Sequence, residues 1–523
     1  MSRPQFRLAG AAAIVALTAA CALPPAPAPT SPVRFLLVND VYVTDTLSDG
    51  SGGLARVARE RGRLAAEGPL LFVLAGDVLS PSLLSKYYSG RQMVEAFNAA
   101  KLDYATFGNH EFELSRDTLV ARIAESKFKW LSANCTQADG TAFPGVLPFD
   151  TLTLRDTTPR RAGDDRPRPQ PRRVGIFGLT LQGQYRSFVR CTNPDSAARA
   201  AIDTLGKLGV DMIVGVTHQT IAADRALLTR EPTLDLILGG HEHEAIDATV
   251  GNRHILKADA NARSVQFATV WGKKGEWVQA ATLIRIDDAI PADTAVARVT
   301  AAWQDSLRRR LGPERPVGSV SEPIDARDIV SRRGESPIGD LVTDAMRTGT
   351  DADVALLNAG TLRLDDVIPA GPISSYTLES LFLFPDEARV VTFPLTGTRL
   401  REILERGVAE GSVGTGAFLQ VSGVKFGYDP ARPTGSRIVG DVVRADGRPI
   451  GAADVVRVAF DVYPACEGGD GYAVPEAKEA CATWRTAPRA ADLLVRHVTE
   501  RLGGKIVVPE AGRITRAGAA AGS

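Results

Sequence analysis

Short apolar runs alternate with amphipathic stretches along the first half of the chain. Six runs have the length and apolar character of buried strands: Arg34–Asn39, Leu70–Ala75, Tyr104–Phe107, Val174–Leu179, Met212–Thr217 and Leu234–Leu238. Four stretches between them have a helical period: Leu54–Ala65, Gln92–Ala100, Ser196–Leu208 and Ile221–Thr229. Strands that alternate with helices in this way predict a layered α/β domain.

A second α/β pattern begins near Val317, after an amphipathic segment, Ala295–Leu311, that ends at Gly312-Pro313. Helices are predicted at Ile338–Arg347 and Gly397–Arg406, and strands at Val354–Leu357, Arg389–Phe393 and Val455–Phe460. We therefore predict a first domain over residues 33–294, a linker helix over 295–315, a second domain over 316–512 and a flexible tail over 513–523. The Arg-, Pro- and Asp-rich segment Arg155–Arg173 has no apolar period and is expected to be an exposed loop.

The N-terminus carries an export signal. Arg3 and Arg7 precede an apolar run, Leu8–Ala20, that is too short to span a bilayer comfortably, so residues 1–20 are predicted to be a signal peptide. Thr18-Ala19-Ala20-Cys21 resembles a bacterial lipoprotein signal, which predicts a lipidated Cys21 and a Pro-rich tether over residues 21–32. A simple secretory signal is the alternative. The expected location is the cell envelope, facing the periplasm or the cell surface, with membrane contact only through the lipid.

Charge and cysteine content agree with an exported, soluble domain pair. The 61 Lys and Arg residues balance 61 Asp and Glu residues, so no overall field favours a nucleic acid polymer as a partner. Besides Cys21, the chain has Cys135, Cys191, Cys466 and Cys481, which allow three pairings in an oxidising compartment. We favour Cys135–Cys191 and Cys466–Cys481, because each pair then lies inside one predicted domain.

Metal-ligand residue types follow several of the predicted strands. In open α/β sheets, sites form beyond the carboxyl ends of strands, so these side chains are expected to gather along one sheet edge. Two divalent ions about 4 Å apart can clamp the oxygens of a phosphate ester, and carboxylate, His and Asn side chains suit such ions. The candidates are Asp40, Asp77, Asn109, His110, His218, His241 and His243.

This order of motifs resembles the calcineurin-like metallophosphoesterases. The segments Val38-Asn39-Asp40-Val41 and Gly52-Gly53-Leu54-Ala55-Arg56 narrow the resemblance to the 5′-nucleotidase family. The resemblance implies a four-layer α/β/β/α sandwich followed by a C-terminal α/β substrate-binding domain. It also implies two divalent ions, whose identity among Zn, Mn, Fe, Mg and Ca stays open.

The resemblance further implies a role for each residue of the motifs. Asp77 would bridge the two ions; Asp40 and His243 would bind one, and Asn109, His218 and His241 the other. His110 would stabilise the transition state and protonate the leaving group, and a water activated by the ions would attack the phosphorus.

Two positions depart from the family pattern. Tyr42 lies where a metal-binding His is expected, and a neutral phenol is a poor ligand for a divalent ion. Glu113 replaces the Asp that usually follows the catalytic His by three residues, and is expected to orient His110 from a longer arm.

The second half resembles the substrate domain of the same family. The stretch from Arg332 to Glu335 is similar to an Arg-x-x-Glu motif, and Asn358-Ala359-Gly360-Thr361-Leu362-Arg363 to an Asn-Gly-Gly-x-x-Arg loop. Arg332 and Arg363 would therefore bind phosphate, since a guanidinium donates two bonds at once. The other implied substrate contacts are Asn358, Phe384, Tyr463 and Asp470. Phe384 would stack on a base, whereas the second stacking position is Pro464, with Tyr463 one residue away.

The leading hypothesis is hydrolysis of phosphate monoesters, chiefly nucleoside 5′-monophosphates or related nucleotides. The incomplete aromatic pair leaves a sugar- or glycerate-phosphate phosphatase open, as well as a nucleotide diester or pyrophosphate hydrolase. A non-catalytic surface binding lipoprotein is the alternative from another class. The sequence does not predict the oligomeric state.

Overall fold

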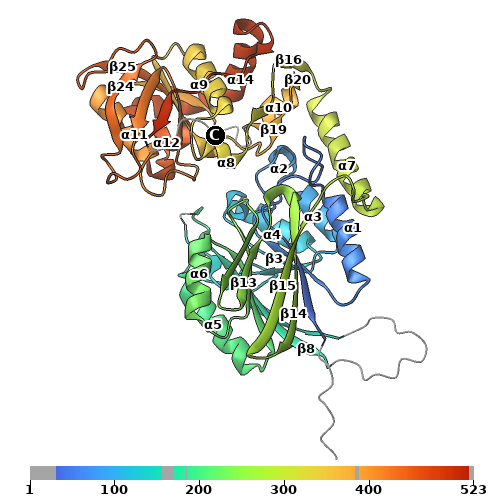
Figure 1. Cartoon of the computed structure of the whole chain (residues 1–523). Helices are drawn as coiled ribbons and strands as arrows, with labels where there is room; N and C mark the ends of the chain where they lie inside the picture. The colour runs from blue at the N-terminus through green and yellow to red at the C-terminus, as the bar shows by residue number, and fades with distance from the viewer. Residues whose placement is uncertain (1–30, 156–169, 184, 383–387, 518–523) are drawn as a thin grey trace, which may run out of the picture.

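Two stacked sheets form the centre of the N-terminal domain (Figure 1). The computed structural model describes residues 31–155, 170–183, 185–382 and 388–517. The first sheet has seven strands, in the spatial order β15 (Glu276–Arg285), β14 (Ser264–Lys273), β1 (Val33–Val38), β2 (Leu71–Ala75), β3 (Tyr104–Thr106), β4 (Lys129–Leu131) and β6 (Val146–Leu147). The second has six, in the order β12 (Ile246–Val250), β13 (Arg253–Lys257), β11 (Leu236–Gly240), β10 (Met212–His218), β8 (Arg172–Thr180) and β7 (Phe149–Leu154).

Side chains of the central strands are buried on both faces. In β1, Phe35 and Leu37 pack against the second sheet, whereas Leu36 and Val38 pack against helices. The helices that cover the first sheet include α1 (Leu54–Ala65), α3 (Arg91–Ala100) and α4 (Arg116–Glu125), and those on the second are α5 (Pro194–Lys207) and α6 (Ile221–Arg230). Because both faces of each sheet are covered, the sequence of each central strand is a nearly continuous run of apolar residues. The predicted four-layer α/β/β/α sandwich is confirmed.

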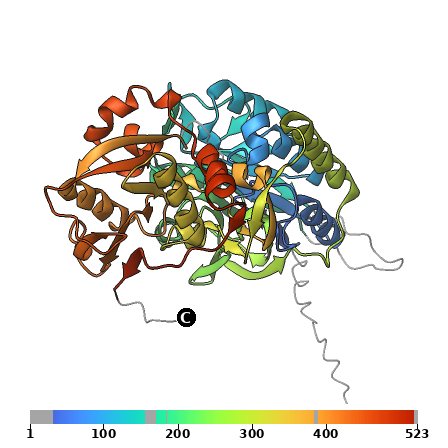
Figure 2. The same ribbon diagram turned by 90° about the horizontal axis from the view of Figure 1, so that it is seen from above.

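A long helix, α7 (Thr294–Leu311), leads from the first domain to the second. Asp293 caps its N-terminus by accepting the backbone N–H groups of residues 295 and 296. The indole N–H of Trp303 donates to Glu95 of α3 at 3.0 Å, so α7 stays on the surface of the first domain. Viewed from above, α7 runs along the blue helices of that domain (Figure 2).

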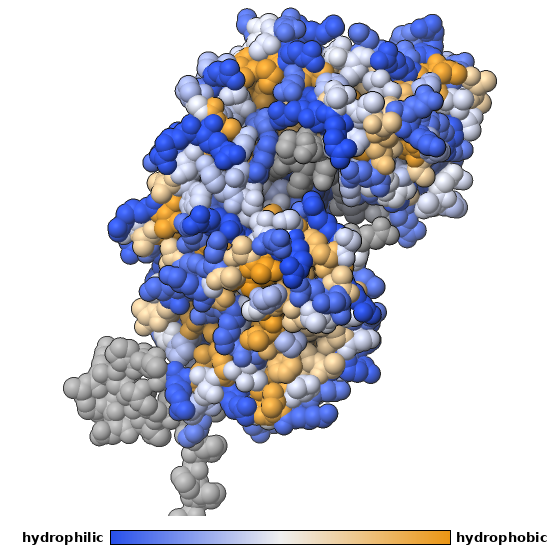
Figure 3. All heavy atoms as spheres, turned by 180° about the vertical axis from the view of Figure 1, so that it is seen from behind, coloured by the Kyte–Doolittle hydropathy of each residue, from blue (hydrophilic) through white to orange (hydrophobic). Residues whose placement is uncertain are grey.

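The C-terminal domain is built on a four-stranded sheet in the order β21 (Val390–Thr396), β25 (Val455–Asp461), β18 (Val354–Asn358) and β22 (Leu419–Ser422). The helices α9 (Pro337–Gly349) and α14 (Ala490–Arg496) cover one face, and α11 (Gly397–Gly407) covers the other. One smaller sheet has the strand order β20 (Gly371–Ser374), β16 (Pro316–Val320) and β26 (Lys505–Ile506). Another has the order β24 (Ile438–Arg444), β23 (Val424–Tyr428) and β27 (Ile514–Arg516). Polar residues dominate the face in Figure 3, with apolar residues in small patches.

Short elements complete the two domains. In the first these are α2 (Leu83–Tyr88), β5 (Cys135–Gln137) and β9 (Val189–Cys191). In the second they are β17 (Ile324–Asp325), α8 (Asp328–Ser331), β19 (Val367–Ile368), α10 (Ser375–Ser380), α12 (Val462–Cys466) and α13 (Lys478–Cys481).

The expected tail from residue 513 is wrong for its first residues. β27 pairs in parallel with β23, and Glu335, two residues before α9, holds the segment that leads into it. The Glu335 carboxylate accepts the backbone N–H groups of Gly512, Arg513 and Ile514 at 2.7 to 3.0 Å. β27 is only three residues long and has no apolar run by which the sequence would show it. These polar contacts, and not burial of apolar side chains, hold it in place.

Both favoured disulfides are confirmed. Cys135 and Cys191 are directly opposite each other on the antiparallel pair β5–β9. Cys466 and Cys481 join α12 to α13. Within the described ranges, no helix is both long and apolar enough to cross a membrane.

Candidate metal centre and substrate cleft

The candidate ligands lie at the carboxyl ends of strands from both sheets. Asp40 follows β1, Asp77 follows β2 and Asn109 follows β3, all in the first sheet. His218 ends β10, and the loop with His241 and His243 follows β11, both in the second sheet. The expectation of one sheet edge is therefore corrected, because the ligands gather where the ends of two stacked sheets meet.

Tight turns aim these side chains at one point. Four non-glycine residues of the cluster have positive φ: Asp40 (52°), Asp77 (56°), His241 (93°) and His243 (61°). Such backbone is costly for residues with a side chain, and it persists where the surroundings hold it. The concentration of this strain in the cluster is typical of a functional site.

Small residues let the turns approach each other closely. A Cβ on Gly108 would lie 2.0 Å from Oδ1 of Asp77, and a Cβ on Gly240 would lie 2.4 Å from the carbonyl oxygen of Ala75. At both positions a side chain would clash with the neighbouring loop. Glycine is therefore needed for the close approach of that loop, not for the conformation of its own turn.

The buried carboxylate of Glu111 ties two of the turns together. It accepts the N–H groups of Asp77, Val78 and Leu79 at 2.7 to 2.9 Å, and that of Gly108 at 2.6 Å. Glu111 is fully buried, so these bonds are shielded from competing water. One side chain thus fixes both the turn that carries Asp77 and the turn that leads to Asn109.

Oxygen and nitrogen ligand atoms converge around Asp40 and Asp77. Nε2 of His218 lies 3.1 Å from Oδ2 of Asp77 and 3.9 Å from Oδ1 of Asp40. Nε2 of His243 lies 3.4 Å from the same Oδ1 of Asp40. The Tyr42 hydroxyl lies 3.3 Å from Asp40, 3.2 Å from Asp77 and 3.0 Å from Nε2 of His243. Tyr42 therefore points into the ligand cluster, as the missing His would.

Several buried atoms of the cluster suit a cation. Nδ1 of His218 donates to the carbonyl oxygen of Ala75 at 2.8 Å, which turns Nε2 toward the two carboxylates. In the described part of the chain, His218 Nε2 and Asn109 Oδ1 are buried without a hydrogen-bond partner. A buried imidazole nitrogen and a buried amide oxygen beside two carboxylates fit divalent cations with mixed N/O shells.

Opposite charges dominate the electrostatics of the cluster. Burial alone would raise the pKa of Asp40, but the imidazoles of His218 and His243 outweigh burial and lower that pKa to about 2. Burial would also raise the pKa of Asp77, but the imidazoles of His218 and His110 hold it well below its usual range. Burial would lower the pKa of His218, but Asp77 and Asp40 raise it to about 9. Both carboxylates are thus ionised at neutral pH.

His241 and Tyr42 are neutral at the same pH. Burial, and then the neighbouring His218, lower the pKa of His241 to about 3. Burial and the two carboxylates raise the pKa of the Tyr42 phenol well above its usual value.

His110 lies between the cluster and the second domain. Its Nδ1 contacts the Glu113 carboxylate, and its Nε2 lies 3.8 Å from Oδ2 of Asp77. Nη1 of Arg363, from the C-terminal domain, lies 3.3 Å from the same Nε2. Because a guanidinium only donates, Nε2 accepts here and Nδ1 carries the proton that faces Glu113. The longer Glu113 side chain therefore reaches His110.

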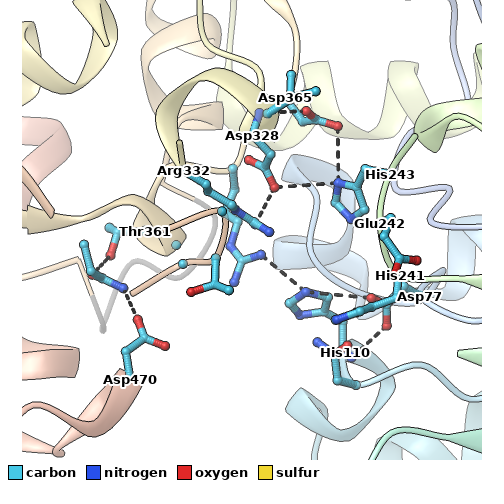
Figure 4. A pocket seen from close by; sticks show the side chains of 18 of the residues that line it. Asp77, His110, His241, Glu242, His243, Asp328, Arg332, Thr361, Asp365 and Asp470 are labelled. Atoms are coloured by element: carbon cyan, nitrogen blue, oxygen red, sulfur yellow. Dashed lines mark hydrogen bonds and ion pairs between the residues drawn. The ribbon is translucent and has the colours of Figure 1, made fainter. Parts of the chain in front are cut away.

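The C-terminal domain forms the opposite wall of a cleft. Nδ2 of Asn358 donates to Asp470 at 2.7 Å, and the Thr361 hydroxyl lies 2.6 Å from Oδ1 of Asn358 (Figure 4). A Cβ on Gly469 would lie 2.5 Å from the Tyr463 ring, so the ring lies flat against that glycine. The cleft has a volume of about 820 Å³, which is in the range of small-molecule sites. Asp77, His110, Arg332, Arg363 and Tyr463 are among its lining residues.

Comparison with known proteins now assigns the two halves. Residues 33–245 match the family described as calcineurin-like phosphoesterase, and residues 316–477 match the 5′-nucleotidase C-terminal domain. The chain belongs to the 5′-nucleotidase family. It is a metal-dependent phosphoric ester hydrolase.

Relatives span most of the chain. The human 5′-nucleotidase is 25% identical over 505 residues, which are 84% of this chain and 84% of the human protein. The snake venom 5′-nucleotidase of Naja atra is 25% identical and covers 82% of this chain and 86% of its own. The crystal structure of a 5′-nucleotidase precursor from Thermus thermophilus has a TM-score of 0.79 at 24% identity, covering 94% of this chain and 100% of that one. That structure shares the fold of this 5′-nucleotidase family member.

Two buried carboxylates of this family member were missed by the sequence analysis. Asp328 and Asp365 come from the C-terminal domain and lie 3.7 Å from Nδ1 of His243 (Figure 4). With His243 they form a second group of potential ligands besides Asp40, Asp77 and His218. Asp328 also contacts Arg332, four residues later in the chain. An acidic residue four positions before a candidate phosphate-binding arginine is the sequence signal that could have identified Asp328.

Some predicted residues lie outside the described part of the chain. They are Cys21 and Phe384. Every other predicted metal, catalytic or substrate residue lies at the cluster or the cleft just described.

Proposed function

We propose that the protein hydrolyses nucleoside 5′-monophosphates or related nucleotides at a two-metal site. One observation carries the proposal: Arg363 from the substrate domain meets His110 at the edge of the ligand cluster, 3.3 Å from its Nε2. A phosphate bound between the two domains would face the Arg363 guanidinium on one side and the ligand cluster on the other. The cleft continues from there to the Asn358–Asp470 pair and Tyr463, which leaves space for a nucleoside.

Asp77 is proposed as the ligand shared by both ions. Asp40 and His243 would hold one ion, and Asn109, His218 and His241 the other. When bound, such ions would neutralise phosphate charge and supply an activated water for in-line displacement. The ionised state of Asp40 and Asp77 and the orientation of His218 Nε2 toward them support this assignment.

His110 is proposed as the group that stabilises the transition state and protonates the leaving oxygen through Nε2. Glu113 holds the opposite ring nitrogen and would stabilise the charged imidazolium. Arg363 would move from Nε2 to the phosphate when substrate enters, so that Nε2 could take up from solvent the proton that it then donates to the leaving oxygen. Arg332, held by Asp328, would supply a second phosphate contact.

Nucleoside recognition is assigned to the far wall of the cleft. Asn358 and Asp470 already pair, so together they present a fixed set of donors and acceptors to a base or a ribose. Tyr463 would stack on the base, and Phe384 is proposed as its partner.

Export with a lipid anchor at Cys21 is proposed for the mature protein. Two disulfides, one in each domain, support an oxidising compartment. A Cys21→Ser variant should leave the membrane fraction or fail to mature. A wild-type protein that is soluble and carries no lipid by mass spectrometry would favour plain secretion.

Phosphate release from a substrate panel tests the function. The panel contains nucleoside 5′-monophosphates, sugar phosphates, a glycerate phosphate and a phosphodiester, each with Mn²⁺, Zn²⁺, Mg²⁺ or Ca²⁺. We expect the nucleotides to give the highest kcat/KM, and Asp77→Asn to remove nearly all turnover. Asp139→Asn, at an exposed carboxylate, is the matched control and should keep the wild-type rate. Higher kcat/KM for the sugar or glycerate phosphates would overturn the nucleotide assignment, and an active Asp77→Asn protein would overturn the two-metal site.

A further inference from the structure

The two ring nitrogens of His243 face different domains. Nε2 faces Asp40 and Tyr42 in its own domain, at 3.4 and 3.0 Å. Nδ1 faces two carboxylates of the C-terminal domain, Asp328 and Asp365, each at 3.7 Å (Figure 4). The ring therefore lies between the proposed metal site and the other domain.

His218 and His110 differ from His243 in this respect. Nδ1 of His218 donates to the carbonyl oxygen of Ala75, and Nδ1 of His110 contacts Glu113, both within the N-terminal domain. Among the described residues, Nδ1 of His243 has no hydrogen-bond partner, and the carboxylates nearest to it belong to the C-terminal domain. A ligand histidine is normally oriented by a partner on its second nitrogen, so this partner must come from across the cleft.

The two carboxylates are buried and held in place. Asp328 is 4% exposed and Asp365 is 7% exposed. Oδ1 of Asp365 accepts the backbone N–H of Asp328 at 2.9 Å, which leaves Oδ2 toward His243. Oδ2 of Asp365 and Oδ1 of Asp328 have no hydrogen-bond partner in the part of the chain that the structure describes. Oδ2 of Asp365, a buried acceptor without a partner, thus lies 3.7 Å from a buried ring nitrogen that also lacks one, whereas Oδ2 of Asp328, the oxygen of that residue nearest the ring, contacts Arg332.

The loop that carries Asp365 is docked on the N-terminal domain. Arg263 donates to the backbone oxygen of Asp365 at 2.7 Å, and its guanidinium lies 3.7 Å from the carboxylate. The Ser48 N–H donates to Asp366 at 3.0 Å, and the Ser48 hydroxyl donates to Val367 at 2.6 Å. The position of Asp365 beside His243 therefore depends on docking of the two domains.

We propose that Asp365, assisted by Asp328, is a positioning residue that orients the metal ligand His243 through Nδ1, so that one metal site is complete only while the domains are docked. A small closure from 3.7 Å makes the Nδ1–H···O bond that holds the ring. The same carboxylate raises the basicity of Nε2 toward the ion. Docking of the substrate domain then strengthens metal binding in the first domain, and the ion in turn stabilises docking, because coupling between two binding events is reciprocal.

A third cation between His243, Asp328 and Asp365 is the competing interpretation of the same cluster. Arg332 contacts Asp328, and Arg263 lies against Asp365, so both carboxylates already have a cationic neighbour. An ion on Nδ1 as well as on Nε2 would also require His243 to lose both of its ring protons. These two facts favour orientation of the ring over a separate metal site.

The test measures metal binding, not turnover, on the full-length apo protein. Mn²⁺ and Zn²⁺ titrations by calorimetry, with elemental analysis after dialysis, give the affinity and number of ions. Asp365→Asn should weaken one ion about 10- to 100-fold, the usual loss for a partner of a ligand histidine, and leave the tighter ion unchanged. Asp366→Asn, on the same docked loop but facing Ser48, is the matched control and should bind both ions as wild type does.

A double-mutant comparison separates this inference from the proposed function on which it rests. His243→Ala should weaken the same ion, and adding Asp365→Asn to it should cause no further loss. If His243→Ala leaves both affinities unchanged, the ligand assignment itself fails. If His243→Ala weakens an ion but Asp365→Asn and Asp328→Asn do not, only the positioning role fails.

Three other results would also overturn the positioning role. Equal losses in Asp365→Asn and Asp366→Asn would show that only docking matters. Three bound ions in wild type and two in Asp365→Asn would establish the separate cation site. An unfolded Asp365→Asn protein leaves the decision to Asp328→Asn, for which a smaller loss at the same ion is expected and wild-type affinity contradicts the proposal.

Discussion

At the residue scale, Tyr42 most directly changes the chemistry of the metal cluster. Its hydroxyl lies within 3.3 Å of Asp40, Asp77 and His243, among atoms proposed to bind one ion. The phenol is neutral at physiological pH, because burial and the two carboxylates raise its pKa. A neutral phenol donates weakly to a divalent ion, whereas an imidazole is a common ligand.

The two ions should therefore bind unequally. The ion beside Tyr42 lacks an imidazole, whereas the other retains Asp77, Asn109, His218 and His241. Tyr42→His should raise occupancy at the weaker site, as measured by metal content after dialysis at limiting metal. Equal and tight occupancy in the native protein would show that Tyr42 is itself an effective ligand or that another residue takes its place.

His110 should affect turnover without affecting metal content. It is proposed to act on the leaving oxygen and not on an ion, and Glu113 orients it from the side opposite Nε2. His110→Ala should lower kcat by roughly 10²- to 10⁴-fold, the scale of a positioned acid or donor. Elemental analysis of the variant checks the assignment, because loss of an ion would make His110 a ligand.

At the scale of secondary-structure elements, the site depends on turns more than on strands. The strands bring five chain segments to one place, but buried polar groups such as Glu111 decide how the turns after them are shaped. The same principle applies far from the site. Glu335, just before α9, holds β27, which has little apolar character of its own.

Asp340 of α9 should make stability depend on pH. The side chain is 1% exposed, and neither carboxylate oxygen has a hydrogen-bond partner among the described residues, although Arg513 lies 3.4 Å away. Burial raises the pKa of Asp340 to about 8; Arg513 opposes the rise, and Glu335 and Asp344 add to it. Because the folded-state pKa exceeds the unfolded value near 4, the native state retains a proton that the unfolded chain releases between about pH 4 and 8.

Stability should therefore fall as the pH rises through that window. Asp340→Asn removes the ionisation and should be more stable than wild type above pH 8, on the order of 2 to 5 kcal/mol at 1.4 kcal/mol per pKa unit. Denaturant unfolding at pH 5, 7 and 9 measures the difference. Parallel pH profiles for the two proteins would contradict the prediction.

At the scale of the whole molecule, the two domains supply different groups to the two walls of one cleft. The N-terminal domain supplies the acidic and imidazole cluster, and the C-terminal domain supplies the arginines and the Asn358–Asp470 pair. The domains meet in contacts such as Arg363 with His110 and Lys86 with Glu379. Substrate and metal binding are therefore both sensitive to how the domains dock.

Arg363→Ala should separate substrate capture from metal binding. Its guanidinium belongs to the C-terminal domain and contacts His110, which is proposed to act on the substrate and not on an ion. The variant should raise KM for a nucleoside monophosphate by roughly tenfold or more, the scale of a lost charge-assisted hydrogen bond, with metal content unchanged. Loss of metal in this variant would show that the division between the domains is wrong.

The sequence by itself determined the architecture and most of the candidate site. Apolar runs with helical stretches between them predict the strands that carry Asp40, Asp77 and His218, because buried parallel strands must be apolar on both faces. The residue types after those strands predict the metal cluster, since few chemistries need two carboxylates, an Asn and several His at strand ends. The division of four cysteines between two domains likewise predicted both disulfides, which the structure contains.

Only the tertiary structure decided what lies between the domains and between the sheets. No local pattern shows that Asp328 and Asp365 face His243, because that contact joins segments separated by roughly 85 and 120 residues that pack together only when both domains have formed. No local pattern shows that β10 and β11 belong to a second sheet, since a buried strand has the same apolar character in either one. Nor does the sequence show that β27 is ordered, because its order comes from a distant carboxylate that accepts its N–H groups. Side chains within one element carry a periodic signal, whereas polar contacts between distant elements carry none, so those contacts became visible only in the folded chain.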